Sequence, residues 1–293
     1  MRTLAPLARW LLLAAPLCAM SAAALAQQDL SGTWLQKIYN DAPERDAAEI
    51  GEYAGLPLSE AGRVRADSWS AAKWEQPEHE CEPHPADYAP RGPANLRIWA
   101  DMDPHTMQVS VWHTGIMWMQ PQRDFYMDAR AHPPPYAPDS WQGYSTAHWN
   151  ADMLEVDTDH MKEGWLRRNG LARSERAHLK EFYIRHDDYL TLVAIVHDPV
   201  YLTEPYIVSS EWVADPGYHP IPSTCTPSEA LHPRGWVPFH LPGQNGALDE
   251  YARRYGVPVQ AERGGAATMY PEYQAVLARL PIPPPLAAGR STH

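Results

Sequence analysis

Alternating hydrophobic and polar positions fill the middle of the chain and predict a long series of β-strands. The alternation has a period of two, the spacing at which the side chains of an extended strand return to the same face. Short clusters of Asp, Asn, His and Pro separate these segments and are typical of tight turns. The predicted strands are 96–101, 106–113, 116–120, 123–128, 143–149, 153–160, 177–185, 189–197 and 205–213, and an earlier strand begins at Gly32.

The succession of these strands predicts a barrel. No helical period separates them, and this favours antiparallel neighbours because parallel strands need long crossover connections. A set of about eight to ten such strands is enough to close a sheet on itself and remove its edges. Gly32-Thr33-Trp34 also looks like the opening of a lipocalin-type barrel. We therefore expect a mainly β fold, an antiparallel up-and-down meander over residues 27–215 that closes into a calycin-like barrel.

An insertion between the first two strands has a different composition. Residues 41–93 are rich in Ala, Glu, Pro and Gly, and the pattern predicts short helices at 46–54 and 59–69. Ser59 is a typical helix-capping residue at the start of the second helix. Residues 77–93 contain too many prolines for regular structure and are expected to form a surface loop.

The C-terminal part changes character after residue 215. Residues 216–293 are irregular and rich in proline, and we expect them to wrap over the barrel. Short amphipathic helices are predicted at 247–255 and 271–280, and the last residues are expected to be extended or disordered.

The first 26 residues have the features of a signal peptide. Arg2 and Arg9 supply a positive start, an apolar stretch follows, and Ala24-Leu25-Ala26 fits a cleavage pattern. The apolar stretch is too short for a good membrane anchor. Cys18 lacks the leucine three places earlier that a lipoprotein signal needs. We expect a periplasmic or secreted protein whose signal peptide is cleaved after Ala26.

The net charge argues against two classes of partner. The chain has a formal charge of −12, and removal of Arg2 and Arg9 with the signal peptide takes it to −14. Nucleic acid and anionic membrane surfaces are poor partners for such a chain. We predict a small-molecule ligand or substrate, no nucleic acid and no membrane span, and the oligomeric state stays open.

Two cysteines, Cys81 and Cys225, remain after removal of the signal peptide. Neither belongs to a metal-type pair, and in an oxidising compartment a disulfide is the simplest expectation. A bond between them would close a loop of about 145 residues, worth at most roughly 5 kcal/mol in the chain-entropy model. The sequence leaves open whether the two pair with each other.

The stretch FYMDARAHPPPY, residues 125–136, is the strongest candidate for chemistry. Asp128, Arg130 and His132 occupy alternate positions, so an extended backbone would place them on one face. Pro133 keeps His132 out of helical geometry. Arg130 suits an oxyanion or a carboxylate, and His132 suits proton transfer near neutral pH. The alternative is an ion pair between Asp128 and Arg130 that only stabilises a loop.

Other strands also carry ionisable residues at alternate positions. Glu181, Tyr183 and Arg185 share one face of their strand, and Thr158 and His160 share a face of another. The excess of 12 Trp and 15 Tyr over 3 Phe suits an apolar cavity that also orients polar groups, or a core that uses Trp. Faces that point inward would line a ligand cavity, whereas faces that point outward would be solvated surface.

Motifs between residues 121 and 214 resemble a large, mostly uncharacterised family of secreted bacterial proteins. Its members look like M-D-G-R-x-H-P, then W-x-G-x-S-x-G-x-W-x-x-D-x-L-x-V, then E-x-x-x-R and D-P-x-Y-x-x-P. The sequence departs from this pattern at Ala129, Ala147 and Asn150-Ala151. The resemblance implies a shared barrel-like fold and no particular reaction. The matching elements are Met127-Asp128-Ala129-Arg130-Ala131-His132-Pro133, Trp141-Gln142-Gly143-Tyr144-Ser145, Trp149, Asp152, Leu154, Val156, Glu181, Arg185, Asp198-Pro199, Tyr201 and Pro205.

Three other kinds of site find less support. The 14 histidines are scattered and form no H-x-H or HExxH motif, so no metal site or other cofactor is predicted, although a barrel could gather three histidines from different strands. Gly143-Tyr144-Ser145-Thr146-Ala147 lies in a strand series and not at a nucleophile elbow. The Gly264-Gly265 pair has no phosphate-loop lysine.

Two functions follow from these residues. The preferred one is a cofactor-independent lyase, isomerase or hydratase that acts by acid–base catalysis on a small, partly apolar metabolite. Arg130 would stabilise negative charge, His132 and His160 would transfer protons, and Glu181 would orient one of them. The alternative is a lipocalin-like binding protein for an apolar or aromatic ligand. The enzyme requires these groups to converge, and a structural envelope protein would leave them exposed. The predicted substrate-binding residues are Asp128, Trp141, Tyr144, Tyr183 and Arg185.

Overall fold

The structure, a computed structural model, describes residues 28–37, 49–88, 90, 95–116, 122–219, 225–227, 232 and 234–286. The predicted signal peptide, positions 117–120 and the chain end from 287 onward lie outside these residues. Their predictions therefore stay predictions.

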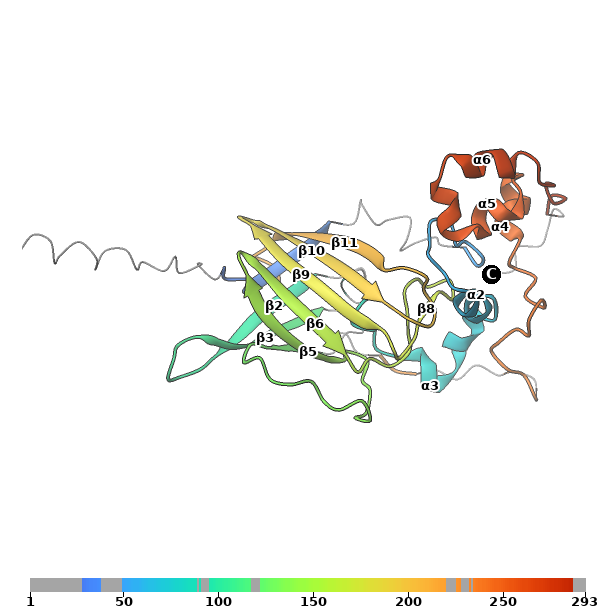
Figure 1. The fold of residues 1–293 in the computed structure, drawn as a ribbon. Helices are drawn as coiled ribbons and strands as arrows, with labels where there is room; N and C mark the ends of the chain where they lie inside the picture. Colours follow the sequence, from blue (N-terminus) through green and yellow to red (C-terminus); the bar gives the residue numbers. More distant parts are fainter. Residues whose placement is uncertain are drawn as a thin grey trace, which may run out of the picture.

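Nine strands of the described chain close into a barrel (Figure 1), which confirms the predicted fold class. Their order around the barrel is β1-β11-β10-β9-β6-β5-β4-β3-β2. A separate two-stranded ribbon, β7 with β8, was not predicted. The strands are β1 (Gly32–Lys37), β2 (Leu96–Met102), β3 (Val109–Ile116), β4 (Arg123–Tyr126), β5 (Tyr144–Asn150), β6 (Met153–Asp159), β7 (Gly164–Trp165), β8 (Ala172–Arg173), β9 (His178–His186), β10 (Tyr189–His197) and β11 (Tyr206–Ala214).

One pair of neighbours departs from the predicted meander. Strands β4 and β5 run parallel, with Phe125 opposite Ser145 and Tyr126 opposite Thr146. All other neighbours in the barrel are antiparallel. Parallel pairing requires a crossover connection of about a dozen residues or more. Residues 127–143 supply this connection, here called the crossover loop, and its proline run leads into a turn in which Ala137 N–H donates to the Pro134 carbonyl at 2.8 Å.

The pairing register decides which predicted faces point inward. Glu181 and Tyr183 of β9 point into the barrel with Leu179, as the shared face required. On β10 the inward face is apolar, because Leu190 and Leu192 are buried whereas Tyr189 is exposed. The predicted polar positions Glu181 and Tyr183 on β9 therefore belong to the interior, and those on β10 belong to the outer surface.

Two apolar clusters fill the interior. The first lies within the barrel and contains the fully buried Trp34 and Trp212, with further residues from most strands. The second contains Leu179 and Val196 from the barrel, together with Tyr53 and Met161 from segments outside it. The second cluster thus joins the barrel to the elements that cover one of its ends.

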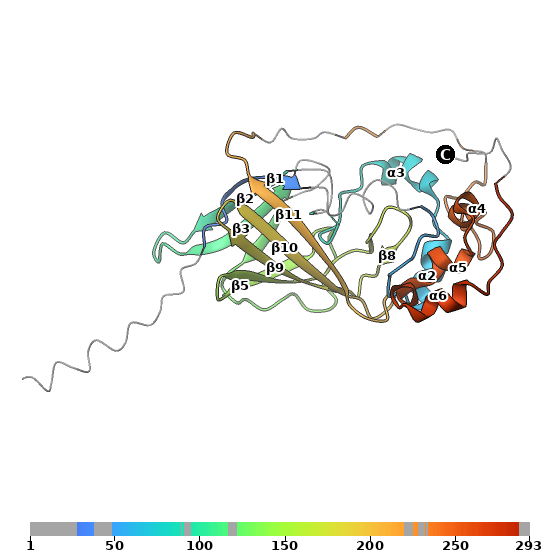
Figure 2. The same cartoon turned by 90° about the horizontal axis from the view of Figure 1, so that it is seen from above.

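Short helices gather at that end of the barrel (Figure 1 and Figure 2). The predicted cap is confirmed, because the Ser59 hydroxyl accepts from the Gly62 N–H at 3.0 Å. The C-terminal helices lie beside α2, where Tyr53 N–H donates to the Glu262 carbonyl at 2.8 Å. The helices are α2 (Glu60–Asp67), η1 (Ala71–Glu75), α3 (Pro77–Glu80), α4 (Glu250–Tyr255), α5 (Val259–Arg263), η3 (Gly265–Met269) and α6 (Glu272–Leu277).

Two local predictions in the insertion were wrong. Residues 49–54, the described part of the helix predicted at 46–54, form turns. Gly51 has a φ of +90°, and a Cβ there would lie 2.6 Å from the Leu248 carbonyl oxygen, so a regular helix does not fit. The stretch 77–93, expected to be an irregular surface loop, begins with the helix α3 (Pro77–Glu80) and is partly buried, because Asp87 forms an ion pair with the buried Arg173 at 3.1 Å.

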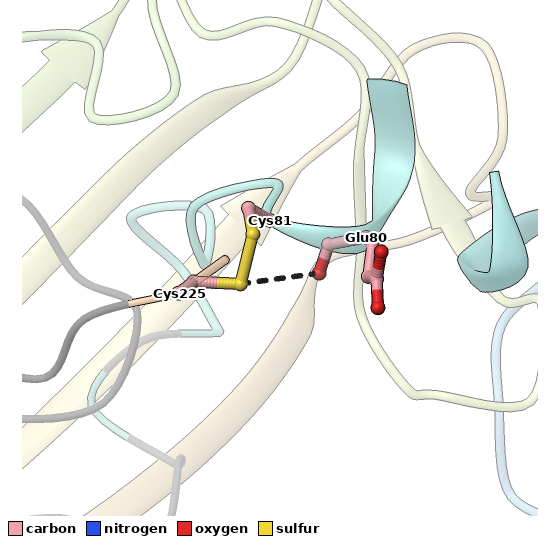
Figure 3. The surroundings of a disulfide bond; sticks show 3 residues. All are labelled: Glu80, Cys81 and Cys225. Atoms are coloured by element: carbon pink, nitrogen blue, oxygen red, sulfur yellow. Dashed lines mark hydrogen bonds between the residues drawn. A yellow bond between two sulfur atoms is a disulfide. The ribbon is translucent and has the colours of Figure 1, made fainter. Parts of the chain in front are cut away.

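A disulfide joins Cys81 to Cys225, with the two Cα atoms 5.8 Å apart (Figure 3). The bond connects the end of α3 to the segment that follows β11. The pairing that the sequence left open is therefore between these two residues. Within the described part of the chain, no helix combines the length and apolar character needed to span a membrane.

The helical end contains a buried carboxyl group. The side chain of Glu262 in α5 is 1% exposed, and burial raises its pKa to about 7, with Glu49 and Asp249 acting in the same direction. Arg263 acts in the opposite direction, and its guanidinium is also bonded to Asp67 at 2.6 Å. Glu262 therefore favours folding in its neutral form.

We predict that Glu262 makes the protein less stable as the pH rises. The unfolded carboxyl ionises near its ordinary value of 4.5, whereas the folded one stays neutral to about 7, so its stabilising contribution is lost across that window. Glu262→Gln should gain stability relative to the wild type from pH 4.5 upward, reaching on the order of 3 kcal/mol above pH 7. Thermal denaturation between pH 4 and 8 measures this difference. Glu272→Gln, on the exposed side of α6, is the control, and a constant difference between wild type and Glu262→Gln would contradict the prediction.

Candidate functional site

An ion pair between Arg123 of β4 and Glu181 of β9 lies inside the barrel. Arg123 Nη1 donates to Glu181 Oε1 at 3.0 Å, and Nη2 donates to Oε2 at 2.6 Å. The two side chains are 1% and 0% exposed. A bidentate arrangement of this kind compensates both charges where water cannot.

Hydroxyl groups and an aromatic ring complete the surroundings of this pair. Arg123 Nη2 also donates to the Thr158 hydroxyl at 3.0 Å, and the guanidinium lies 4.8 Å from the centre of the Phe125 ring. The Tyr183 hydroxyl donates to Glu181 at 3.4 Å, and burial together with the Glu181 carboxylate raises the pKa of Tyr183 well above its usual value. The interior thus contains a neutralised polar cluster between the two apolar clusters.

Arg123 was not among the predicted site residues. Glu181 was expected to share a face with Arg185 and to converge with Arg130, but its ion-pair partner is Arg123. Arg185 lies at the barrel rim, where its Nε donates to the Asp187 carbonyl at 2.8 Å and its guanidinium lies 5.2 Å from the Trp34 ring. The signal for Arg123 was present in the alternation of Arg123 and Phe125 along a very short strand.

The crossover loop carries the other predicted residues on the outside of the barrel. Strand β4 ends at Tyr126, and Ala129 has a φ of +53°, so the stretch is not extended and the expected common face is lost. Asp128 and Arg130 form an exposed bidentate pair, with both bonds at 2.7 Å, and Arg130 lowers the pKa of Asp128. This matches the alternative in which the pair stabilises a loop.

His132 turns away from that pair and contacts the outer face of β5 and β6. Its Nδ1 lies 2.7 Å from Asp159 Oδ1, and its Nε2 lies 2.8 Å from the Thr146 hydroxyl. The hydrogen bond of the imidazole is the one between Nε2 and the Thr146 hydroxyl, whereas Asp159 Oδ1 has no hydrogen-bond partner among the described residues and contributes only a nearby negative charge. Thr146 and Asp159 follow the inward-facing Ser145 and Thr158, so the barrel wall separates His132 from Glu181.

His160 supports the same loop. Its Nε2 lies 3.0 Å from the Pro133 carbonyl oxygen, and its Nδ1 lies 3.5 Å from Asp139. The backbone of Ser140 also bonds on both sides to this strand end, with Ser140 N–H donating to the His160 carbonyl at 2.9 Å. The two predicted proton-transfer residues are therefore close in space and hold the crossover loop against β5 and β6.

A pocket of about 350 Å³ opens at the parallel seam between β4 and the approach to β5. Three aromatic side chains line it among polar ones, and two of them, Trp141 and Tyr144, were predicted to bind substrate. His132 lies behind Tyr144, with the ring centres 5.3 Å apart. The lining residues are Gln122, Arg123, Asp124, Tyr126, Ser140, Trp141, Gln142, Gly143, Tyr144 and Ser145.

A larger groove of about 710 Å³ lies among the C-terminal helices. Its lining includes Val257, Met269, Leu277 and Ile282 and contains no ionisable side chain. It therefore offers apolar contact with two polar side chains, Thr268 and Gln274, and no charged one. The seam pocket, whose lining combines aromatic rings with the charged Asp124, is the better candidate site.

The described residues contain no group of three or more His, Cys, Asp or Glu side chains arranged to hold a metal. The segment from His79 to His84 contains two histidines and Cys81. Cys81 is in the disulfide, and His84 is buried against Tyr88. Burial lowers the pKa of His84 to about 4, so its imidazole is neutral at pH 7.

Comparison with known proteins returned no match to a family model, a curated protein or a solved structure. The resemblance drawn from the motifs at 127–133 and 141–156 therefore stays a prediction.

We predict that Arg123→Met destabilises the fold far more than Arg130→Met. The first leaves the Glu181 charge buried without its partner, which typically costs about 3–5 kcal/mol, whereas the second removes one arm of an exposed pair. Chemical denaturation of both variants measures the contrast. Arg123→Met with Glu181→Met should recover much of the loss, because no lone charge remains. Equal losses in the two single variants would show that the interior pair is not structurally important.

Proposed function

We propose that this protein binds a small, partly apolar ligand in the seam pocket and that it does so in an exported compartment. The observation that supports this proposal is the pocket wall, where Tyr126, Trp141 and Tyr144 line a space of about 350 Å³ together with polar side chains. Apolar walls with a few polar groups are the usual composition of a small-molecule site.

The arrangement of the predicted catalytic residues favours binding over catalysis. Glu181 is bonded to Arg123 within the barrel, Arg130 is bonded to Asp128 at the surface, and His132 lies outside the wall. An acid–base enzyme needs these groups around one shared space. A binding protein needs only the pocket.

The exported location is supported by two features. The Cys81–Cys225 disulfide is typical of proteins that fold in oxidising compartments. The N-terminal sequence has the composition of a signal peptide.

An acid–base enzyme is a second candidate, because one observation favours it. His132 Nε2 lies 2.8 Å from the Thr146 hydroxyl and Nδ1 lies 2.7 Å from the Asp159 carboxylate, so a hydroxyl and a negative charge flank the imidazole. It is also next to Tyr144, which lines the pocket. In this function His132 would transfer a proton to or from a ligand that displaces or reorients Tyr144.

We predict that Trp141→Ala and Tyr144→Ala each weaken the binding of a single-ring probe such as 4-ethylphenol by roughly threefold to tenfold, through lost ring contact. Isothermal titration and saturation-transfer NMR measure the affinities, and thermal melts check the fold. The control is Tyr136→Ala, because this tyrosine lies in the same loop, is 88% exposed and does not line the pocket. Unchanged affinity in both pocket variants would place the ligand elsewhere.

The enzyme candidate predicts a different effect of His132. Compounds that bind, taken from a library of aromatic and terpenoid metabolites, are incubated with the protein and followed by mass spectrometry. If the protein converts one of them, His132→Gln should lower kcat by a factor of about 10² or more with little change in binding. Thr146→Val tests the hydroxyl contact. Conversion by His132→Gln at the wild-type rate would remove His132 from the reaction.

A further inference from the structure

The charge of the seam pocket comes from one of its lining residues. Among the residues that line it in the described chain, Arg123 and Asp124 carry a formal charge. The guanidinium of Arg123 is neutralised by both oxygens of Glu181. Asp124 is the next residue along β4 and points to the opposite face, where its side chain is 38% exposed. A ligand in this pocket therefore meets the carboxylate of Asp124.

Asp124 is held in place by two neighbours on one of its oxygens. Gln122 Nε2 donates to Asp124 Oδ1 at 2.7 Å, and His113 Nδ1 lies 2.8 Å from the same atom. The other ring nitrogen of His113 lies 3.1 Å from Asp101, and the imidazole stacks on Trp99. Two carboxylates thus share one imidazole, so this cluster carries a net negative charge whether His113 is neutral or protonated.

The aromatic walls of the pocket already attract cations within the protein. The guanidinium of Arg130 lies 3.9 Å from the centre of the Tyr126 ring. The ammonium group of Lys162 lies 5.5 Å from the centre of the Trp141 ring. Faces of Tyr and Trp rings carry negative partial charge, and a neighbouring carboxylate strengthens this preference.

We propose that the ligand of this pocket is a small amine, with its ammonium group at Asp124 and its apolar or aromatic body against Tyr126, Trp141 and Tyr144. This inference rests on the proposed binding function and names the class of ligand. The formal charge of −12 acts in the same direction, because it attracts cations and repels carboxylates over the whole surface. Arg130 and Lys162, which lie over the Tyr126 and Trp141 rings, compete with the ligand for these rings.

Three probes of similar shape test whether the pocket prefers a positively charged ligand. Tyramine, 4-ethylphenol and 4-hydroxyphenylacetate share a phenol ring and differ in a cationic, neutral or anionic side arm. Isothermal titration of the full-length mature protein should give tyramine an affinity about tenfold above that of the other two at low salt. The advantage should shrink at high salt, because Asp124 is partly exposed.

Single-residue variants test which side chain causes the higher affinity for tyramine. Asp124→Asn should remove most of the advantage of tyramine, and Lys162→Gln should increase it. Asp101→Asn is the control, since it removes a carboxylate from the same imidazole outside the pocket and should keep most of the advantage. Equal affinities for the three probes, or an advantage of tyramine that survives Asp124→Asn, would overturn the proposal of an amine ligand. The proposal that the pocket binds a small ligand would still stand. Failure of all three probes to bind would overturn the proposed function as well.

Discussion

A closed ring with an odd number of strands cannot be antiparallel throughout. Neighbours in an antiparallel sheet alternate in direction, and nine alternations around the described barrel do not return to the starting direction. One parallel pair is therefore unavoidable, and here it is β4 with β5. The long crossover loop follows from this requirement, and the pocket opens at the same seam. The candidate site thus lies at the place where the topology interrupts the meander.

The interior of the barrel is organised around the pair of Arg123 and Glu181. Each charge would be very costly alone at this depth, so the two residues fix the relative positions of β4 and β9, which are not neighbours in the sheet. Trp34, Trp212 and Tyr183 occupy much of the remaining space on one side of the pair. This filled interior explains why the groups that suit ligand contact lie at the seam.

The barrel could be predicted from the sequence because one face of each long strand is apolar. Leu190, Leu192, Ala194 and Val196 repeat at the strand period and leave little choice of fold. The crossover loop was not predicted, because Ala129 adopts a left-handed conformation that residues other than glycine rarely adopt, whereas the alternating pattern favoured an extended strand.

The candidate site was predicted in part. Trp141 and Tyr144 were selected and line the pocket. Asp124 and Arg123 were missed because their partners, His113 and Glu181, are distant in sequence. The link between Cys81 and Cys225 encloses every barrel strand except β1, which fills the gap between β2 and β11 without being part of the covalent ring. A protease cut in the crossover loop would therefore yield two fragments that migrate as one band on a non-reducing gel and separate only after reduction.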